Sequence, residues 1–475
     1  MFCKDNAAGI LLPAVPTVMP AVMLTVMLTV AGVAVAQAPV NRRYTETLLG
    51  PLPSEQYDSA VISPNGRRLA SIEPSQAGQA VVVDGRSQKA YDRVAAPQFS
   101  PDSRWLAYAA SAAGKWYLVV NQREQGPYDR VGPPVFSPNS RRLAHVALLP
   151  DGKRVVVVNN KPGKPYDEIF DGAIVFGGDG SRLAYGVRLG QQWHIVLDDQ
   201  EGGPFDYLGS RTGIRFSPDG RRMAFAAYSA EKRQWSVVVD QQPQPAYENL
   251  GQLVFNGDGN RLAYAAMRPD GQWLVVVDGQ EQKPYKAIGD GTLQFDPDGR
   301  TLVYAAEAGE KWLVVAGDHE GTPFDEVAEI RFSPDGRRLA YTATSGGTET
   351  VVLDGRPQRP FDRVGGGTLT FSRDGRRWGH IARLGNASFV VVDGRRNRRY
   401  DMVGYLTFTP DGAHYVYAAT RGKEAFTVVD DQEAARRYEA IWTVPEARLP
   451  FDSAKRFHYL GLKQGNVYLV EEDVD

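Results

Sequence analysis

The sequence predicts an all-β fold, a β-propeller of about eleven four-stranded blades, from three observations. The segment RFSPDGRRLAY at 331–341 recurs almost unchanged at 215–225 as RFSPDGRRMAF. Weaker copies follow at intervals of about 39 residues, a period that indicates a solenoid, a propeller or an array. Each unit holds four short runs rich in β-branched and aromatic residues, without helical periodicity, which favours a propeller blade. The copies are anchored by Phe99, Phe136, Phe176, Phe216, Phe255, Phe295, Phe332, Phe371 and Phe408.

The strands can be followed in order along the unit 213–251. Its runs IRF, RMAFAAY, WSVVVD and AYENL are separated by Pro-Asp-Gly, by a charged loop and by QQPQ. In the equivalent segment Ser333-Pro334-Asp335-Gly336, proline suits the second position of a type I turn, and glycine suits the left-handed position after it. A second tight turn follows the VVVD run, as at Asp354-Gly355. These two turns lie on one face of a blade, the turn face, so the other loops form the opposite face, the loop face.

The ends of the repeat region predict how the ring closes. The last unit ends at 467–471 without a fourth strand, so a strand near the N-terminus is expected to complete the last blade and remove an exposed sheet edge. Because propellers typically have four to eight blades, eleven favours two rings, such as five plus six, with one large ring as the alternative. Fourth strands of the PYD type are predicted at Tyr57, Tyr91, Tyr128, Tyr166, Phe205, Tyr247, Tyr285, Phe324, Phe361, Tyr400 and Tyr438.

The repeat resembles a known family of propeller repeats. The FSPDGRRLAY core, the WxVVVDG strand and the PYDxV strand are similar to the WD40-like repeats of the TolB propeller and of prolyl-oligopeptidase-type enzymes, over nearly all of 50–475. The repeats do not have the Gly-His and Trp-Asp pairs of eukaryotic WD40 repeats, and the extra domain that precedes the propeller in a TolB-like protein is not expected here. The resemblance therefore implies the fold and leaves the function open, since such propellers serve many tasks.

The N-terminal segment has the pattern of a secretory signal. An apolar run at 21–36 ends in the small-x-small triplet Ala34-Val35-Ala36, which is typical of a cleavage site. Cleavage after Ala36 predicts a periplasmic or secreted protein with no stable membrane span, and an uncleaved anchor is the alternative. The predicted organisation is a signal peptide at 1–36, a short N-terminal extension at 37–50 and propeller repeats at 51–475.

Composition and motifs exclude several function classes. A net charge of −2 gives the whole chain no attraction to nucleic acid. The 6 histidines are spread over different units, so no metal site and no cofactor are expected. No serine has the G-x-S-x-G surroundings of a hydrolase elbow, and the glycine of the motif leads into a strand rather than a phosphate-binding helix. The recurring arginine pairs leave open a role in binding polyanions or lipid headgroups.

The loop face is where the sequence stops repeating, so contact residues are expected there. Aromatic and arginine side chains dominate protein interfaces, although loop side chains that pack over the core are an equally good interpretation. The sequence therefore predicts an exported, non-catalytic scaffold that binds another envelope or secreted protein. A propeller that binds a small molecule or glycan is the alternative, followed by a hydrolase or lyase with its site at the funnel mouth. The predicted contact residues are Phe170, Tyr207, Arg211, Tyr405 and Trp442.

Overall fold

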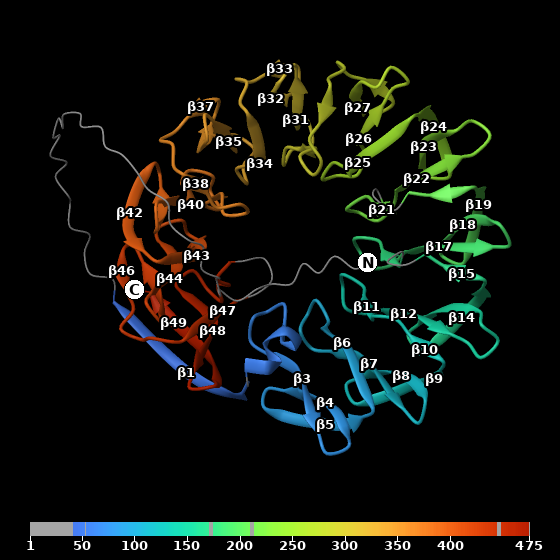
Figure 1. Cartoon of the computed structure of the whole chain (residues 1–475), viewed down its shortest axis with the longest axis horizontal. Coiled ribbons are helices and arrows are strands. Elements are labelled where there is room, and N and C mark those ends of the chain that lie inside the picture. Colours follow the sequence, from blue (N-terminus) through green and yellow to red (C-terminus); the bar gives the residue numbers. More distant parts are fainter. Residues whose placement is uncertain (1–40, 53, 171–173, 210–212, 444–447, 475) are drawn as a thin grey trace.

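The structure, a computed structural model of the chain, describes residues 41–474 apart from 53, 171–173, 210–212 and 444–447. Its strands form eleven sheets that follow one another around a single ring (Figure 1). We number the blades 1 to 11 in chain order. Within each sheet the first strand lies nearest the ring axis, and the fourth lies at the outer rim. The predicted β-propeller of eleven four-stranded blades is therefore confirmed.

The first five blades have the following bounds. Blade 1 comprises β2 (Val61–Ile62), β3 (Leu69–Ser75), β4 (Gly78–Val83) and β5 (Arg86–Tyr91). Blade 2 comprises β6 (Arg93–Phe99), β7 (Leu106–Ala112), β8 (Lys115–Val120) and β9 (Arg123–Tyr128). Blade 3 comprises β10 (Arg130–Val131), β11 (Val135–Phe136), β12 (Leu143–Leu148), β13 (Arg154–Val158) and β14 (Lys161–Tyr166). Blade 4 comprises β15 (Glu168–Ile169), β16 (Val175–Phe176), β17 (Leu183–Leu189), β18 (Gln192–Leu197) and β19 (Gln200–Phe205). Blade 5 comprises β20 (Tyr207–Leu208), β21 (Arg215–Phe216), β22 (Met223–Ser229), β23 (Gln234–Val239) and β24 (Gln242–Tyr247).

The remaining blades continue the same order. Blade 6 comprises β25 (Asn249–Phe255), β26 (Leu262–Met267), β27 (Trp273–Val277) and β28 (Gln280–Glu281). Blade 7 comprises β29 (Ala287–Ile288), β30 (Gln294–Phe295), β31 (Leu302–Ala308), β32 (Lys311–Ala316) and β33 (His319–Glu320). Blade 8 comprises β34 (Glu326–Phe332), β35 (Leu339–Ser345), β36 (Thr348–Leu353) and β37 (Arg356–Pro357). Blade 9 comprises β38 (Arg363–Val364), β39 (Thr370–Phe371), β40 (Trp378–Leu384), β41 (Ala387–Val392) and β42 (Arg395–Tyr400). Blade 10 comprises β43 (Met402–Phe408), β44 (Tyr415–Arg421), β45 (Glu424–Val429) and β46 (Gln432–Glu433). Blade 11 comprises β47 (Ala440–Trp442), β48 (Arg456–Lys463), β49 (Asn466–Val474) and β1 (Arg42–Pro51), and the 3-10 helix η1 (Ser54–Ser59) leads from β1 to β2.

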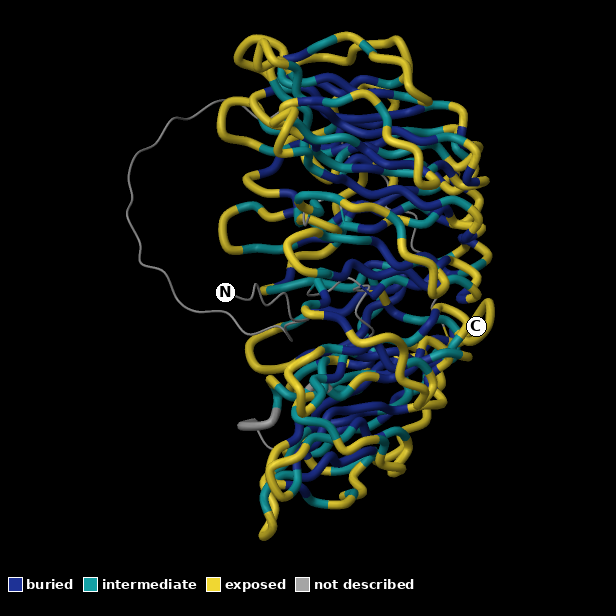
Figure 2. Tube along the Cα trace, turned by 90° about the vertical axis from the view of Figure 1, so that its right-hand side faces the viewer, coloured by how far each residue is buried: buried dark blue, intermediate teal, exposed yellow. Residues whose placement is uncertain are grey.

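The core consists of apolar clusters between neighbouring blades rather than one central mass. The second and third strands, such as β26 and β27, are almost wholly buried because both of their faces pack against other sheets. Figure 2 shows these buried segments through the middle of the ring's thickness, with exposed turns on both faces. At ten interfaces an aromatic residue of the fourth strand packs edge-on against an aromatic or histidine ring of the next blade, as Tyr247 does against Tyr264.

The ring count corrects the expectation of two propellers. Apolar clusters join every consecutive pair of blades, including blades 10 and 11 through Tyr438 and Tyr459, and blades 11 and 1 through Leu460 and Leu69. No interface is left at which a smaller ring would close within the described residues. The preference for five plus six blades is therefore wrong, and the alternative of one large ring is correct.

The N-terminal strand closes the ring, as predicted. β1 pairs antiparallel with β49, from Arg42 opposite Val474 to Pro51 opposite Asn466. The closing strand lies before Tyr57, which had been predicted to lie in a fourth strand and instead belongs to η1, where its ring packs against Trp442 at 5.3 Å. The propeller thus reaches into the segment 37–50 that the sequence suggested as an extension.

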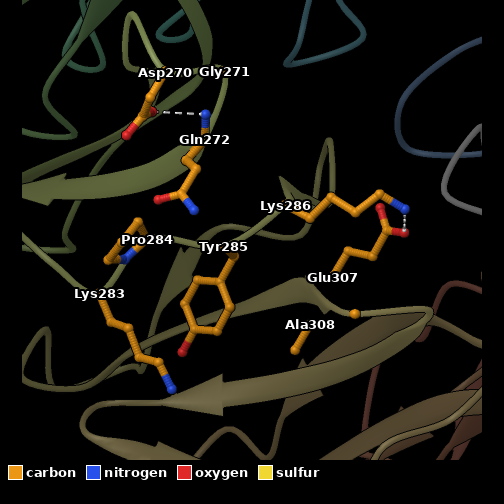
Figure 3. Close-up of a pocket in the computed structure, with 10 residues that line it drawn as sticks. Asp270, Gly271, Gln272, Lys283, Pro284, Tyr285, Lys286, Glu307 and Ala308 are labelled. Atoms are coloured by element: carbon orange, nitrogen blue, oxygen red, sulfur yellow. Dashed lines mark hydrogen bonds and ion pairs between the residues drawn. The ribbon is translucent and has the colours of Figure 1, made fainter.

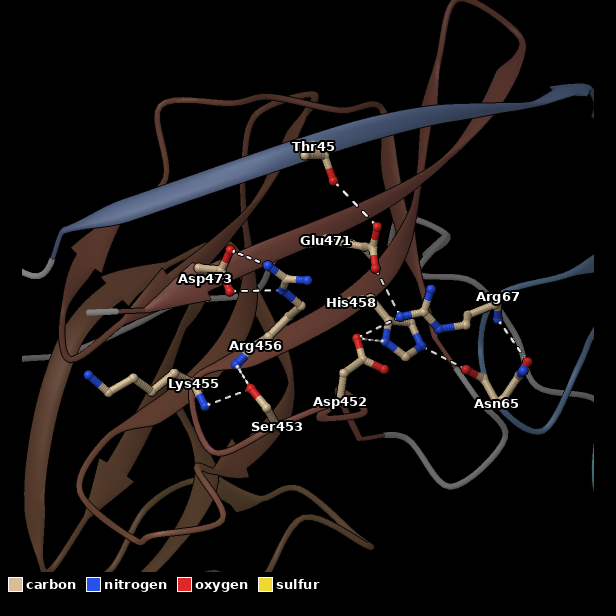
Figure 4. Close-up of polar contacts among 10 residues, drawn as sticks. All are labelled: Thr45, Asn65, Arg67, Asp452, Ser453, Lys455, Arg456, His458, Glu471 and Asp473. Carbon is tan, nitrogen blue, oxygen red and sulfur yellow. Dashed lines mark hydrogen bonds and ion pairs between the residues drawn. The ribbon is translucent and has the colours of Figure 1, made fainter.

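Polar contacts also hold blade 1 to blade 11 (Figure 4). Arg67 donates hydrogen bonds to Asp452 at 2.8 Å and to Glu471 at 2.9 Å. The buried His458 ring lies between Asp452, at 2.9 Å, and the Asn65 carbonyl oxygen, at 2.7 Å. Closure therefore combines strand pairing, an apolar cluster and a charged network. Within the described part of the chain, no helix is long and apolar enough to cross a membrane.

Candidate interaction surfaces

The polar residues of the repeated motif are used to build the turn. The Ser333 hydroxyl is buried, donates to the Asp335 carboxylate at 2.6 Å and accepts from the Arg338 backbone N–H at 2.9 Å. The hydrogen bond from Ser333 holds the pKa of Asp335 below its usual value. Gly336 has a φ of 69°, the left-handed conformation that the turn requires. The predicted hairpin turn is confirmed, and the serine is occupied in it.

The second arginine of each pair joins neighbouring blades on the turn face. Arg222 forms an ion pair with Asp240 at 3.1 Å, donates to the Asn260 carbonyl of the next blade at 2.9 Å, and lies 5.4 Å from the Phe255 ring centre. The same ion pair with the aspartate of the second turn recurs at Arg68, Arg182, Arg261, Arg338 and Arg377. By contrast, the first arginine is largely exposed at Arg221, Arg337 and Arg376, whereas Arg67 joins blade 1 to blade 11. More than half of the predicted basic ring is thus committed to internal contacts.

Carboxylates connect the blades in a similar way on the loop face. Asp325, which follows the fourth-strand aromatic, accepts a hydrogen bond at 2.8 Å from the Gly346 backbone N–H in the hairpin of the next blade. The hydrogen bonds that this carboxyl accepts, first from Lys311 and then from Gly346, lower its pKa. The same contact is made by Asp92, Asp167, Asp206, Asp362, Asp401 and Glu439.

Blade 7 departs from this pattern and carries a pocket. Lys286 occupies the position of the aspartate after Tyr285, and its ammonium pairs with Glu307 at 2.5 Å. Consequently, no carboxylate of the described residues caps the backbone N–H of Gly309 in the hairpin of blade 7. The pocket there has a volume of about 420 Å³ and lies between the hairpins of blades 6 and 7 (Figure 3).

The polar groups around this pocket already have internal partners. Lys283 pairs with Glu320 at 2.6 Å, and the Tyr285 hydroxyl donates to the same carboxylate at 2.6 Å. Burial, together with this hydrogen bond, raises the pKa of Tyr285. Asp270 accepts from the Gln272 backbone N–H at 3.0 Å. The pocket therefore has no free base or nucleophile among the described residues, and its lining includes the Lys286–Glu307 pair and Gly309.

Three of the predicted contact residues pack inside or between blades. Phe170 lies against the Trp193 ring at 5.4 Å, within blade 4. Tyr405 packs in the cluster between blades 10 and 11, and burial raises its pKa. Trp442 packs against Tyr57 in the cluster between blades 11 and 1. For these three the packing interpretation describes the structure.

Tyr207 differs, because 58% of its surface is exposed on the loop face of blade 5, beside Tyr228 at 5.9 Å. Arg211 lies outside the described residues. The four predicted residues that the structure describes come from blades 4, 5, 10 and 11, and they are not brought together into one site. Among the described residues, no group of three or more His, Cys, Asp or Glu side chains is placed to hold a metal.

Sequence reasoning missed two features that a column-by-column comparison of the repeats could have found. The first is Lys286, where other units carry an acid. The second is the outer strand β42, RRNRRY, because the equivalent strands of other units contain proline or carry fewer charges. Both are departures from the repeat, and a repeat unit that departs from its copies is a better guide to function than the copies themselves.

The fold defines the chain as a β-propeller of eleven four-stranded blades, as the repeats predicted. No protein-family model matches the sequence, and no match was found among curated proteins. The structure is similar to that of a eukaryotic initiation factor, at 12% identity and a TM-score of 0.39, over 77% of this chain and 97% of the other. It is also similar to TolB from Acinetobacter baumannii, at 15% identity and a TM-score of 0.25, over 53% of this chain and 78% of the other. At these values neither neighbour indicates a function for this chain.

Proposed function

We propose that this chain is an exported, non-catalytic scaffold that binds another envelope or secreted protein through its loop face. One observation supports it above the others: the Ser, the Asp and the second Arg of the repeat, whose side chains could serve chemistry, are engaged in contacts that build and join the blades. Tyr207 remains as a large exposed side chain on the loop face, and tyrosine is enriched at protein interfaces.

The export part of the proposal rests on the sequence of the N-terminal segment. Processing after Ala36 would leave Arg42, the first residue of the closing strand, in the mature chain. Mass spectrometry of the protein from the fraction outside the cytoplasmic membrane should therefore find Gln37 as its first residue. An intact N-terminus in the membrane fraction would favour the uncleaved anchor instead.

The scaffold role can be tested by site-specific photocrosslinking. A photoreactive phenylalanine analogue at Tyr207 should yield one discrete adduct with an envelope or secreted protein in the source cells. The matched control is the same analogue at Trp105, which is 45% exposed on the turn face and should give no such adduct. Equal labelling from both positions, or none from Tyr207, would count against a loop-face partner.

The pocket between blades 6 and 7 supports a second candidate function, binding of a small anionic molecule. An anion that displaces Glu307 from Lys286 would meet a positive charge there and a donor in the Gly309 N–H, at a position where other blades hold a carboxylate. Short dicarboxylates should then raise the melting temperature of the purified protein, and the Lys286→Ala variant should abolish the increase. If the increase persists in that variant, the ligand binds elsewhere.

A further inference from the structure

The outer strand of blade 9 is the most basic segment of the rim. β42 reads RRNRRY, and Arg395, Arg396, Arg398 and Arg399 are all exposed. No acidic residue lies in this strand, whereas the corresponding six-residue strands β9 and β19 contain a glutamate, and β24 contains no charge. The charge is therefore local to one blade in a chain whose net charge is only −2.

These arginines have no ion-pair partner among the described residues. Two acids of blades 9 and 10 are committed elsewhere: Asp393 pairs with Arg377 at 3.0 Å, and Glu433 pairs with Arg421 and Arg437. Burial raises the pKa of Asp431, which accepts a hydrogen bond from the Arg398 backbone and also interacts electrostatically with the Arg398 charge. The Arg396 guanidinium lies 4.7 Å from the Phe389 ring centre, an aromatic contact that leaves its charge uncompensated.

The backbone of β42 is open to a further strand in its N-terminal half, around Arg396, whereas the Arg398 N–H already donates to Asp431. β42 pairs with β41 on one side and ends its sheet on the other. Four of the other six-residue outer strands, β9, β14, β19 and β24, contain proline, which lacks the N–H that an added strand needs. Only β5 and β42 of these strands are free of proline, and β5 carries two basic residues, of which Lys89 is paired with Glu124.

The repeats also indicate which backbone donor is available. Arg396 pairs with Val391, and the equivalent positions in blades 3 and 5 are Pro162, opposite Val157, and Pro243, opposite Val238. Because proline has no N–H, the blade does not need a donor at this position. The Arg396 N–H therefore points to the open edge.

From these observations we propose that β42 binds an extended acidic segment of a partner protein, which adds to blade 9 as a fifth strand. This deepens the proposed scaffold function and rests on it. Added strands gain affinity from main-chain hydrogen bonds and specificity from side chains at alternate positions. Carboxylates on every second residue of an added strand lie about 7 Å apart, which is the spacing of side chains two residues apart such as Arg396 and Arg398.

The same features argue against other occupants. Four like charges on an exposed edge repel the same edge of a second copy, which is how natural sheets avoid self-association. A nucleic acid or an anionic membrane would contact the arginine side chains but not the backbone N–H groups of β42. For such a ligand it would not matter that β42 lacks proline. Only an acidic peptide uses both features.

The test measures binding of a fluorescent ten-residue peptide of alternating Glu and Thr to the purified full chain, by anisotropy at low and high salt. We expect salt-sensitive binding that weakens at least tenfold when alternate backbone nitrogens of the peptide are methylated. A variant with glutamine at all four arginines of β42 should lose binding by a similar factor. The matched control replaces the exposed turn-face residues Arg104, Arg221, Arg337 and Arg376 by glutamine and so removes the same charge. Its affinity for the peptide should stay within twofold of that of the unchanged protein.

A proline substitution separates strand addition from charge attraction. Arg396→Pro should weaken peptide binding more than Arg396→Gln, although both remove one charge. Circular dichroism should confirm that both variants remain folded, because blades 3 and 5 already carry proline at this position, as Pro162 and Pro243. The proposal would be overturned if the two substitutions weakened peptide binding equally. It would also be overturned if heparin, an oligonucleotide or phosphatidylglycerol vesicles bound as tightly as the peptide and lost as much affinity in the four-glutamine variant. A loop-face adduct at Tyr207 without peptide binding would leave the scaffold function standing and refute only the β42 site.

Discussion

Arg42 anchors the closing strand, and its replacement by methionine should strongly destabilise the ring. Its guanidinium pairs with Glu472 and donates to the Thr427 hydroxyl at 2.5 Å and to the Gln432 carbonyl at 3.0 Å, which belong to blade 10. Only 12% of the Arg42 side chain and 3% of the Glu472 side chain are exposed, so the pair is buried. Removing one partner of a buried pair costs about 3–5 kcal/mol, because the remaining charge is left uncompensated.

The expected loss lies at the lower end of that range. Glu472 keeps two hydroxyl donors, Thr427 at 2.9 Å and Tyr459 at 2.7 Å, and each partly compensates the carboxylate. We therefore expect Arg42→Met to lower the free energy of unfolding by about 3 kcal/mol. The double variant Arg42→Met/Glu472→Gln should recover about half of that loss, because it removes the buried charge itself.

Guanidinium unfolding followed by circular dichroism measures these differences. Arg43→Met is the matched control, since Arg43 is exposed on the same strand and its replacement should change stability by no more than about 0.5 kcal/mol. If Arg42→Met and Arg43→Met have the same small effect, the closing strand is not held as the structure describes. If the double variant is as unstable as Arg42→Met, the buried charge is not the cause.

Three further predictions concern contacts between blades. Arg222→Ala should lower stability by about 1 kcal/mol through loss of the contacts to blade 6, measured by guanidinium unfolding, and an unchanged midpoint would refute this role. The double variant Lys286→Asp/Glu307→Thr copies the Asp325–Thr344 arrangement of blade 8, so its new aspartate should accept a hydrogen bond from the Gly309 N–H. The melting temperature should then not fall, and dicarboxylates should no longer raise it. A lower melting temperature would contradict this prediction. Burial lowers the pKa of His380 to about 3, so below pH 6.5 the unfolded chain takes up a proton that the folded chain does not, and stability falls as the pH drops toward 3. His380→Tyr, the residue of most sister blades, should therefore lose less stability between pH 7 and pH 4, and an equal loss would contradict the reasoning.

Local pattern was enough to predict the blade. Ser333, Pro334, Asp335 and Gly336 interact within one turn, so their types alone specify the hairpin, and the structure has the turn predicted. The continuous apolar runs of the central strands likewise identify strands that are buried on both faces. Because the pattern recurs along the chain, counting its copies predicted eleven blades.

The candidate site was less predictable, because a loop position does not tell where its side chain points. Tyr405 and Tyr207 both follow a fourth strand, but one packs into an interface and the other is exposed, according to the residues that the next blade presents. Lys286 and Arg396 are visible in the sequence as departures from the repeat. Their consequence depends on partners such as Glu307, or on the lack of them, and these partners lie in other strands.

By itself, the sequence determined the period, the four strands of a blade, their turns and the need for a strand near the N-terminus to complete the last blade. Only the tertiary structure decided that the blades form one ring and that β1, rather than the segment around Tyr57, is the closing strand. The physical reason is that strand and turn propensities act over a few residues, whereas ring size depends on the angle at which whole blades pack. Closure depends on Arg42 and Glu472, which lie at opposite ends of the repeat region and meet only after every blade between them has packed.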